Sequence, residues 1–143
     1  MLWRRVFFIL RTGSSRNDEG DINGFGGTEN FELRTVTDPP IGRDTVRVKV
    51  AAAAFNPIDY QMRRGSTESK LLKSPILGRE MGGTLTEVGE LVTGFKIGDE
   101  VFGYVGSLAS NGTYAEEVVV PASLIACIPR NLDFAGAAAI RMV

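Results

Sequence analysis

The sequence contains no histidine and only one cysteine, Cys127, among its 143 residues. Without histidine, the chain cannot build a Ser/His/Asp triad or use an imidazole as a general base. With one thiol and no imidazole, it cannot assemble the usual zinc sites, so we expect no metal site. A lone cysteine forms no internal disulfide, which favours a reducing compartment and a cytoplasmic location. Catalysis would therefore depend on carboxylates, hydroxyls, lysine, arginine or a cofactor.

Charge of one sign and long apolar runs are also missing. Sixteen basic and seventeen acidic residues give a net charge of −1. A nucleic-acid partner needs a concentrated basic face, so we expect none. No apolar run approaches the roughly 18 residues of a membrane-spanning helix, so we expect no membrane association. The length suits one domain with its own core.

The N-terminal residues allow two interpretations. Residues 1–16 hold four arginines, no acidic residue and an apolar stripe at helical spacing, which is typical of a mitochondrial presequence. Alternatively, residues 6–10 form a first strand, and the Gly- and Asn-rich residues 11–30 form a loop. We therefore treat residues 1–21 as an atypical extension or a first strand.

The middle of the chain predicts a strand followed by a helix. Residues 45–50 alternate between apolar and polar side chains, and the alanines at 51–54 continue this strand. Asn56-Pro57 then interrupts the pairing, because proline has no N–H to donate. We expect a short helix at 58–64 that is ended by Gly65.

The second half predicts short strands separated by glycine turns. We expect strands at 81–88 (broken by the pair Gly82-Gly83), 100–105, 113–120 and 124–128. Asp133 is a predicted N-cap for an alanine-rich helix at 134–140. Strands at this spacing predict a mainly β fold with short helices, arranged as a small, partly closed β-barrel.

Residues 75–104, PILGREMGGTLTEVGELVTGFKIGDEVFGY, closely resemble the catalytic-domain signature of the medium-chain dehydrogenases/reductases. This superfamily includes zinc alcohol dehydrogenases and quinone reductases. The matching positions of the signature are Gly78, Glu80, Gly83, Gly89 and Val92. The resemblance continues at 56–59, 98–101, 112–116 and 120–122, and spans roughly residues 22–140.

The resemblance implies a domain organisation. It identifies residues 22–132 as the GroES-like domain and residues 133–143 as the start of a helix leading to a nucleotide-binding Rossmann domain. The sequence has no glycine-rich strand–turn–helix unit of that kind after this helix. We therefore expect a chain that lacks the Rossmann domain of the full-length family.

Two departures from the zinc members imply the zinc-free branch. Zinc members carry a cysteine in the loop that here reads 55–59, and a histidine where Arg79 stands. Arginine does not coordinate zinc. The Asn-Pro-x-Asp loop instead is similar to that of quinone reductases, in which NADPH gives hydride to a quinone or an electron-poor C=C.

In that branch, the Asn-Pro-x-Asp loop lines the cleft beside the nicotinamide. The resemblance implies that Asn56 hydrogen-bonds cofactor or substrate and that Asp59 orients the loop. Relatives often place a tyrosine two residues after the aspartate, but here that position is Gln61, a candidate cofactor contact. The tyrosine is Tyr60, which is either a catalytic residue or an amphipathic wall of the cleft.

Three further residues or segments have a structural and a functional interpretation. Glu80 is either a catalytic group or a buried carboxylate that holds a loop amide or an arginine. Cys127 is predicted as a core thiol rather than a nucleophile. Residues 24–27, Gly-Phe-Gly-Gly, suggest a hairpin loop rather than a phosphate loop, because no strand–helix frame surrounds them.

Two functions follow from these observations. The first is the substrate-side domain of an NADPH-dependent quinone or enone reductase, inactive by itself and without tightly bound NADPH. The alternative is a stand-alone GroES-like binding module. In either case, faces that pack on the Rossmann domain in the full-length family would be exposed, which favours a homodimer or other self-association.

Overall fold

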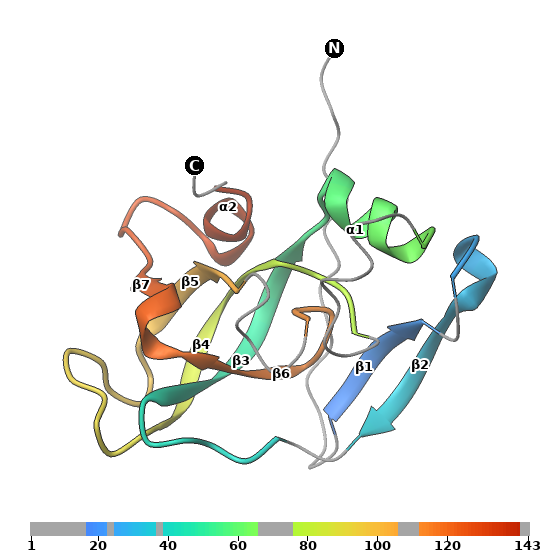
Figure 1. Ribbon diagram of the computed structural model, residues 1–143. Coiled ribbons are helices and arrows are strands. Elements are labelled where there is room, and N and C mark those ends of the chain that lie inside the picture. The colour runs from blue at the N-terminus through green and yellow to red at the C-terminus, as the bar shows by residue number, and fades with distance from the viewer. Residues whose placement is uncertain (1–16, 23–24, 37–38, 66–75, 106–111, 141–143) are drawn as a thin grey trace.

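The computed structural model describes residues 17–22, 25–36, 39–65, 76–105 and 112–140 (Figure 1). The presequence or strand predicted within residues 1–16 lies outside the described residues. No helix in the described part is long and apolar enough to cross a membrane.

The described residues form mainly strands, with two short α-helices and two 3₁₀ turns, Thr28–Asn30 and Ala122–Leu124. The prediction of a mainly β fold with short helices is confirmed. In chain order the elements are β1 (Asn17–Ile22), β2 (Phe31–Val36), β3 (Thr45–Ala54), α1 (Pro57–Arg63), β4 (Glu80–Val88), β5 (Glu100–Tyr104), β6 (Glu117–Pro121), β7 (Ile125–Cys127) and α2 (Phe134–Ala138).

A five-stranded antiparallel sheet in the order β6-β3-β4-β5-β7 forms the body of the fold. Its edges, β6 and β7, are joined by the turn from Pro121 to Ile125. Four Cα steps of about 3.8 Å reach at most about 15 Å, whereas the edges of a flat five-stranded sheet lie about 19 Å apart. The sheet must therefore curl without closing, which confirms the predicted partly closed barrel.

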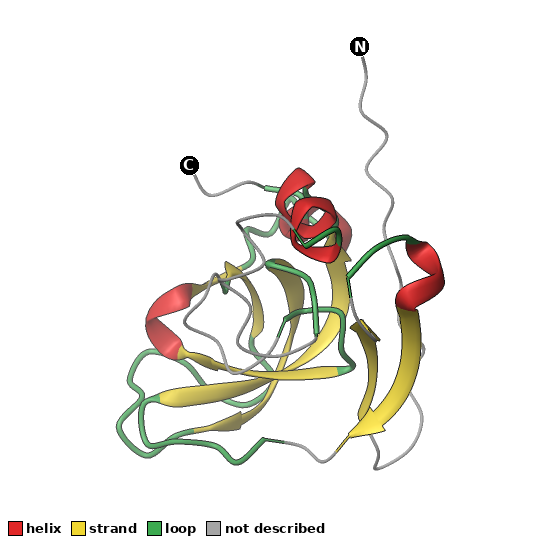
Figure 2. Ribbon diagram, turned by 45° about the vertical axis from the view of Figure 1, so that its right-hand side comes forward, coloured by secondary structure: helices red, strands yellow, loops and turns green. Residues whose placement is uncertain are grey.

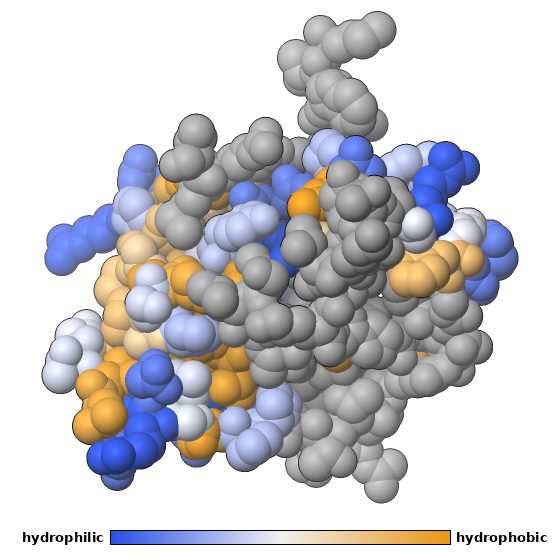
Figure 3. Space-filling view, in the orientation of Figure 1, coloured by the Kyte–Doolittle hydropathy of each residue, from blue (hydrophilic) through white to orange (hydrophobic). Residues whose placement is uncertain are grey.

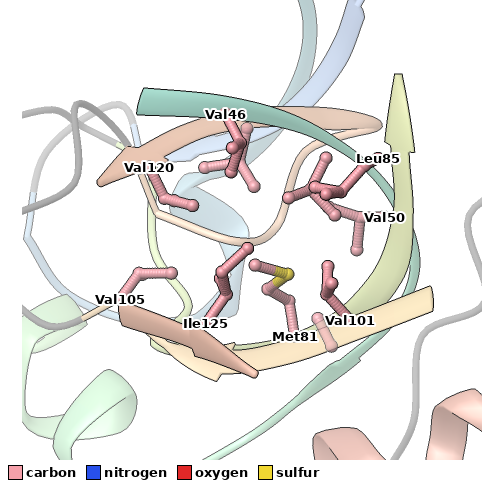
Figure 4. Close-up of a cluster of buried hydrophobic side chains, with 11 residues drawn as sticks. Val46, Val50, Met81, Leu85, Val101, Val105, Val120 and Ile125 are labelled. Atoms are coloured by element: carbon pink, nitrogen blue, oxygen red, sulfur yellow. The ribbon is translucent and has the colours of Figure 1, made fainter. Parts of the chain in front are cut away.

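Buried aliphatic side chains fill the inside of this curl (Figure 4). Val46, Val48 and Val50 alternate along β3 and point inward, as the period-two pattern predicts. Met81 and Leu85 of β4 meet them from the neighbouring strand. Strands β3 to β7 thus contribute the buried residues of this core.

Strand β4 runs without a break through Gly82 and Gly83, contrary to the predicted interruption. A β-carbon at Gly82 would lie 2.7 Å from the carbonyl oxygen of Phe134, at the start of α2. A β-carbon at Gly83 would lie 2.2 Å from the carbonyl oxygen of Lys49. The two glycines therefore allow close packing on both sides of a continuous strand.

Asp133 caps α2 as predicted, and its Oδ1 accepts a hydrogen bond of 2.6 Å from Gly136 N.

Four predictions are wrong in detail. Residues 17–22, predicted as loop, form β1 and pair with β2, although the segment NDEGDI shows no apolar alternation. The strand predicted at 113–120 begins at Glu117, and the helix predicted at 134–140 ends at Ala138. Cys127 is exposed rather than buried, because it lies on the short edge strand β7. The hairpin loop predicted at 24–27 is confirmed, since residues 25–27 connect two paired strands.

Both helices lie at the same end of the curled sheet, as Figures 1 and 2 show from two directions. Helix α1 leaves the end of β3, and α2 packs against β3 and β4. On the face drawn in Figure 3, hydrophobic residues gather toward the lower left, over the sheet and its connecting loops. The polar cluster described next lies at the end where α1 begins.

Candidate functional site

Helix α1 begins directly after β3, and this junction holds the Asn-Pro-x-Asp loop. Asn56 is the N-cap in an extended conformation (φ −118°, ψ 156°), and Pro57 occupies the first helical turn, where its missing N–H costs nothing. Asp59 completes a capping box with Asn56. The helix ends at Arg63, and Gly65 follows the C-cap as predicted. The loop sequence therefore fixes its own backbone locally.

Asp59 joins three segments that are distant in sequence. Its side chain is fully buried, and its Oδ2 accepts a 2.8 Å hydrogen bond from Asn56 N. Its Oδ1 accepts a 3.2 Å bond from Gly78 N, and the Tyr114 hydroxyl donates to Oδ2 at 3.4 Å. Asp59 thus connects the Asn56 loop to the segments that carry Gly78 and Tyr114.

Burial dominates the electrostatics of this carboxyl. Desolvation raises the pKa of Asp59 from 3.8 to about 6, although the amides of Asn56 and Gly78, the charge of Arg79 and the Tyr114 hydroxyl oppose the rise. Burial also raises the pKa of Tyr114, and the neighbouring carboxylate of Asp59 adds to this effect. The tyrosine therefore remains a hydrogen-bond donor at neutral pH.

Glu80 lies at the first position of β4 and is 2% exposed. Its Oε2 accepts a hydrogen bond of 2.7 Å from Asn56 Nδ2. Its Oε1 is buried and has no hydrogen-bond partner among the described residues. The structural interpretation from the sequence, a buried carboxylate that holds a loop amide, is confirmed.

Arg79 occupies the position at which zinc members of the superfamily carry a histidine. Its guanidinium is buried and its Nη2 lies 3.0 Å from Met62 Sδ. Within the part of the chain that the structure describes, no three His, Cys, Asp or Glu side chains gather in a way that could hold a metal ion.

Gly78 allows the turn that brings these groups together. Its φ of +97° is a conformation that side-chain-bearing residues rarely adopt. A β-carbon there would lie 2.4 Å from Thr113 Oγ1 and 2.9 Å from Tyr114 N. Thr113 in turn donates from Oγ1 to the carbonyl oxygen of Glu80 at 3.0 Å. A glycine at this position lets the segment that carries Tyr114 approach the loop.

The structure does not bring all four predicted site residues together. Asn56 and Asp59 share one network with Glu80, but Tyr60 is 40% exposed on another face of α1. The Tyr60 ring lies 4.9 Å from the guanidinium carbon of Arg64 and 5.4 Å from that of Arg63. Gln61 is also exposed on this helix. Asp59 and Tyr60 are adjacent, and neighbouring helical residues point about 100° apart, so one is buried and the other is exposed.

Sequence reasoning did not include Tyr114 among the site residues. The residue lies in the matching segment 112–116, which was used only to establish the resemblance. Its hydroxyl reaches Asp59 across 55 positions of sequence. No local spacing indicates such a contact; the one available signal was a tyrosine beside two small residues in a segment that resembles the family.

Comparisons with known proteins agree with this geometry. Residues 42–130, more than half of the chain, match the alcohol dehydrogenase GroES-like domain. The chain is 38% identical over 125 residues to the 2-methylene-furan-3-one reductase of Solanum lycopersicum, covering 81% of this chain and 32% of that protein. It is 38% identical over 132 residues to the quinone oxidoreductase of Sus scrofa, covering 92% of this chain and 39% of that protein.

Among solved structures, the chain is similar to the quinone oxidoreductase from Coxiella burnetii, with a TM-score of 0.81 and 30% identity. This match covers 88% of the present chain and 41% of that protein. The chain thus spans between about a third and two fifths of the length of the relatives it matches. It belongs to the alcohol dehydrogenase GroES-like domain family of the medium-chain dehydrogenases/reductases.

Proposed function

We propose that this chain provides the substrate-side wall of the active cleft in an NADPH-dependent quinone or enone reductase. The observation that carries the proposal is the anchored loop: the side-chain amide of Asn56, at the start of α1, is held by Glu80 at 2.7 Å. The relatives whose names describe quinone and enone reduction support the substrate class. In this proposal residues 22–132 form the domain, and residues 133–143 lead toward a nucleotide-binding domain.

The side chains at the loop fit a nicotinamide cofactor. Asn56 is half-buried, and an amide offers both a donor and an acceptor to a carboxamide group. NADPH, when bound, supplies the hydride. In this proposal Asn56 contacts cofactor or substrate, Asp59 keeps the loop in place, and Gln61 adds a cofactor contact from the exposed face of α1.

Tyr60 acts in this proposal as a wall residue. Its ring faces the guanidinium groups of Arg63 and Arg64, so its hydroxyl is not part of the Asn56–Asp59 network. Arg79 stands in place of a zinc ligand, and the reduction we propose needs no catalytic zinc. A cytoplasmic location completes the proposal, consistent with a single cysteine.

These 143 residues alone should not catalyse hydride transfer, because they contain no glycine-rich turn for the cofactor pyrophosphate. The first test monitors NADPH absorbance at 340 nm in the presence of 1,4-benzoquinone or an enone. The second titrates NADPH into the ¹⁵N-labelled chain and follows its resonances by NMR. We expect no turnover, but resonance shifts concentrated at Asn56 and α1. Rapid NADPH consumption would contradict the half-cleft assignment, and shifts confined to other regions would contradict the site.

We further propose that the chain self-associates. Large apolar side chains are exposed beside the two helices, including Phe55 and Tyr60 at α1 and Ile140 after α2. Exposed apolar patches favour association in water. Light scattering at increasing concentration should show a rising mean mass. A constant monomeric mass at high concentration would contradict this proposal.

A further inference from the structure

The backbone of Glu80 is fixed from three directions. The residue pairs with Ala54 of β3 on one side and with Tyr104 of β5 on the other. Its carbonyl oxygen accepts a hydrogen bond from Thr113 Oγ1. Because β3 leads directly into the Asn56 loop, the carboxylate is held at a fixed place relative to that loop.

This carboxylate decides which way the Asn56 amide faces. The oxygen and nitrogen of an asparagine amide have nearly the same shape, and their assignment follows from the hydrogen-bond partners. The nitrogen of Asn56 faces Glu80 and donates to its Oε2 at 2.7 Å, with the carboxyl oxygen as acceptor. The amide oxygen is then turned away from Glu80. Donating this hydrogen bond also polarises the amide and makes its oxygen a stronger acceptor.

This pair retains unused acceptor capacity. Glu80 Oε1 is buried and lacks a partner among the described residues, and a buried carboxylate oxygen without a donor is costly. The amide oxygen of Asn56 can accept two hydrogen bonds, and because the capping box uses one of them for the backbone N–H of Asp59, one remains for a ligand. A ligand that brings a donor therefore complements this corner of the site better than one that brings only a carbonyl oxygen.

We propose that Glu80 is a positioning residue that presents Asn56 to its ligand as a hydrogen-bond acceptor. The ligand group that Asn56 recognises is then a donor, such as the carboxamide NH₂ of a nicotinamide or the hydroxyl of a hydroquinone. A carbonyl oxygen, as in a quinone, could contact only the second N–H of the Asn56 amide and not the amide oxygen. This inference rests on the proposed function, in which Asn56 contacts the ligand, and it assigns the contact of the amide oxygen to a donor.

Two small probes distinguish the polarities. Nicotinamide and 3-acetylpyridine have almost the same shape, but the second carries a methyl group in place of the donating NH₂. In NMR titrations of the full chain, we expect nicotinamide to shift the Asn56 side-chain resonances and to bind about fivefold more tightly, which corresponds to one hydrogen bond. Equal or tighter binding of 3-acetylpyridine overturns the assigned polarity.

Variants of Glu80 test the positioning role without any activity assay. In Glu80→Leu the Asn56 Nδ2 proton resonances should move toward those of a free amide, and the preference for nicotinamide should be lost. Glu80→Gln keeps an acceptor oxygen and should retain part of both effects. Glu87→Leu, on the solvent-facing part of the same strand, is the matched control and should leave Asn56 unchanged.

The outcomes separate the two levels of the proposal. The positioning role is overturned if the Asn56 resonances do not change in Glu80→Leu. The resonances of β3 and β5 must show in the same spectra that the variant is folded. If that variant moves Asn56 but neither probe perturbs the wild-type chain, the proposed function fails, and the ligand polarity fails with it. The anchoring of Asn56 by Glu80 is then supported alone.

Discussion

The barrel core and the junction between α1 and β4 are both buried, but they are filled in opposite ways. The core cluster is entirely apolar, with residues such as Val48 and Met81 fully enclosed. The junction instead buries the polar side chains of Asp59, Arg79 and Glu80, which are almost as inaccessible to water as the core residues. Burying charge opposes folding, whereas burying aliphatic groups drives it. The core therefore provides stability, and the junction retains charge at a stability cost, as functional sites commonly do.

The largest effect should come from the core. Met81→Ala removes a fully buried side chain of β4, and we expect a loss of about 2–5 kcal/mol in the free energy of unfolding from the lost burial and the resulting cavity. Urea denaturation measures this loss. Leu91→Ala, at an exposed position, is the control and should change stability by less than about 0.5 kcal/mol. A small effect at Met81 would mean that the core does not carry the stability of the fold.

Gly78→Ala should be the most disruptive change at the junction. A φ of +97° strains an alanine, and the new β-carbon would overlap Thr113 and Tyr114, so we expect a loss of about 2–4 kcal/mol. Gly94→Ala is the matched control, because Gly94 also has a positive φ (+84°) but has nothing within 4 Å of the added carbon. Thermal or urea unfolding of both variants should separate strain from overlap. Equal losses would show that close packing at Gly78 is unimportant.

The junction, unlike the core, should respond to pH. Because the folded pKa of Asp59, about 6, lies above its ordinary value of 3.8, the folded state holds the proton more tightly. The free energy of unfolding should then fall as the pH rises through this window, by up to about 3 kcal/mol relative to Asp59→Asn. Urea denaturation of both proteins across this range measures the difference. The Met81→Ala difference should stay constant over the same range, and a constant Asp59→Asn difference would contradict the raised pKa.

Tyr114→Phe should have a smaller effect. The substitution removes a hydroxyl whose 3.4 Å hydrogen bond to Asp59 holds the loop, at a cost of about 1 kcal/mol. Since that bond lowers the pKa of Asp59, its loss should raise this pKa further. Carboxyl ¹³C shifts of Asp59 followed by NMR against pH would show the change. An unchanged titration would mean that the hydroxyl does not contact the carboxylate in solution.

Cys127→Ser should have the smallest effect. The thiol is exposed on the edge strand β7, outside the core, so we expect a stability change below about 0.5 kcal/mol. The native protein should react readily with a thiol reagent such as 5,5′-dithiobis(2-nitrobenzoic acid). Reaction only after unfolding would restore the interpretation of Cys127 as a core residue and extend the core to the edge of the sheet.

Sequence periodicity located strands that build the core, whereas the candidate site residues came from the family resemblance. The alternation at 45–50 located β3 and its inward face, because one buried face imposes a period of two. The strand β1 was missed because its segment NDEGDI carries no such pattern and acquires its structure by pairing with β2. Cys127 was placed wrongly for a related reason: an apolar strand at a sheet edge leaves side chains exposed, and strand order cannot be read from composition.

The sequence by itself determined the family, the positions of most strands along the chain, the absence of histidine ligands and the self-capped Asn56–Asp59 loop. These features depend on residue identities and short spacings. The tertiary structure alone decided which polar groups meet. Glu80 reaches Asn56 because β3 and β4 pair, and Tyr114 reaches Asp59 because Gly78 leaves room for its segment. It also placed the Tyr60 ring beside the guanidinium group of Arg64. Contacts between distant segments depend on strand pairing and packing, which no local pattern encodes.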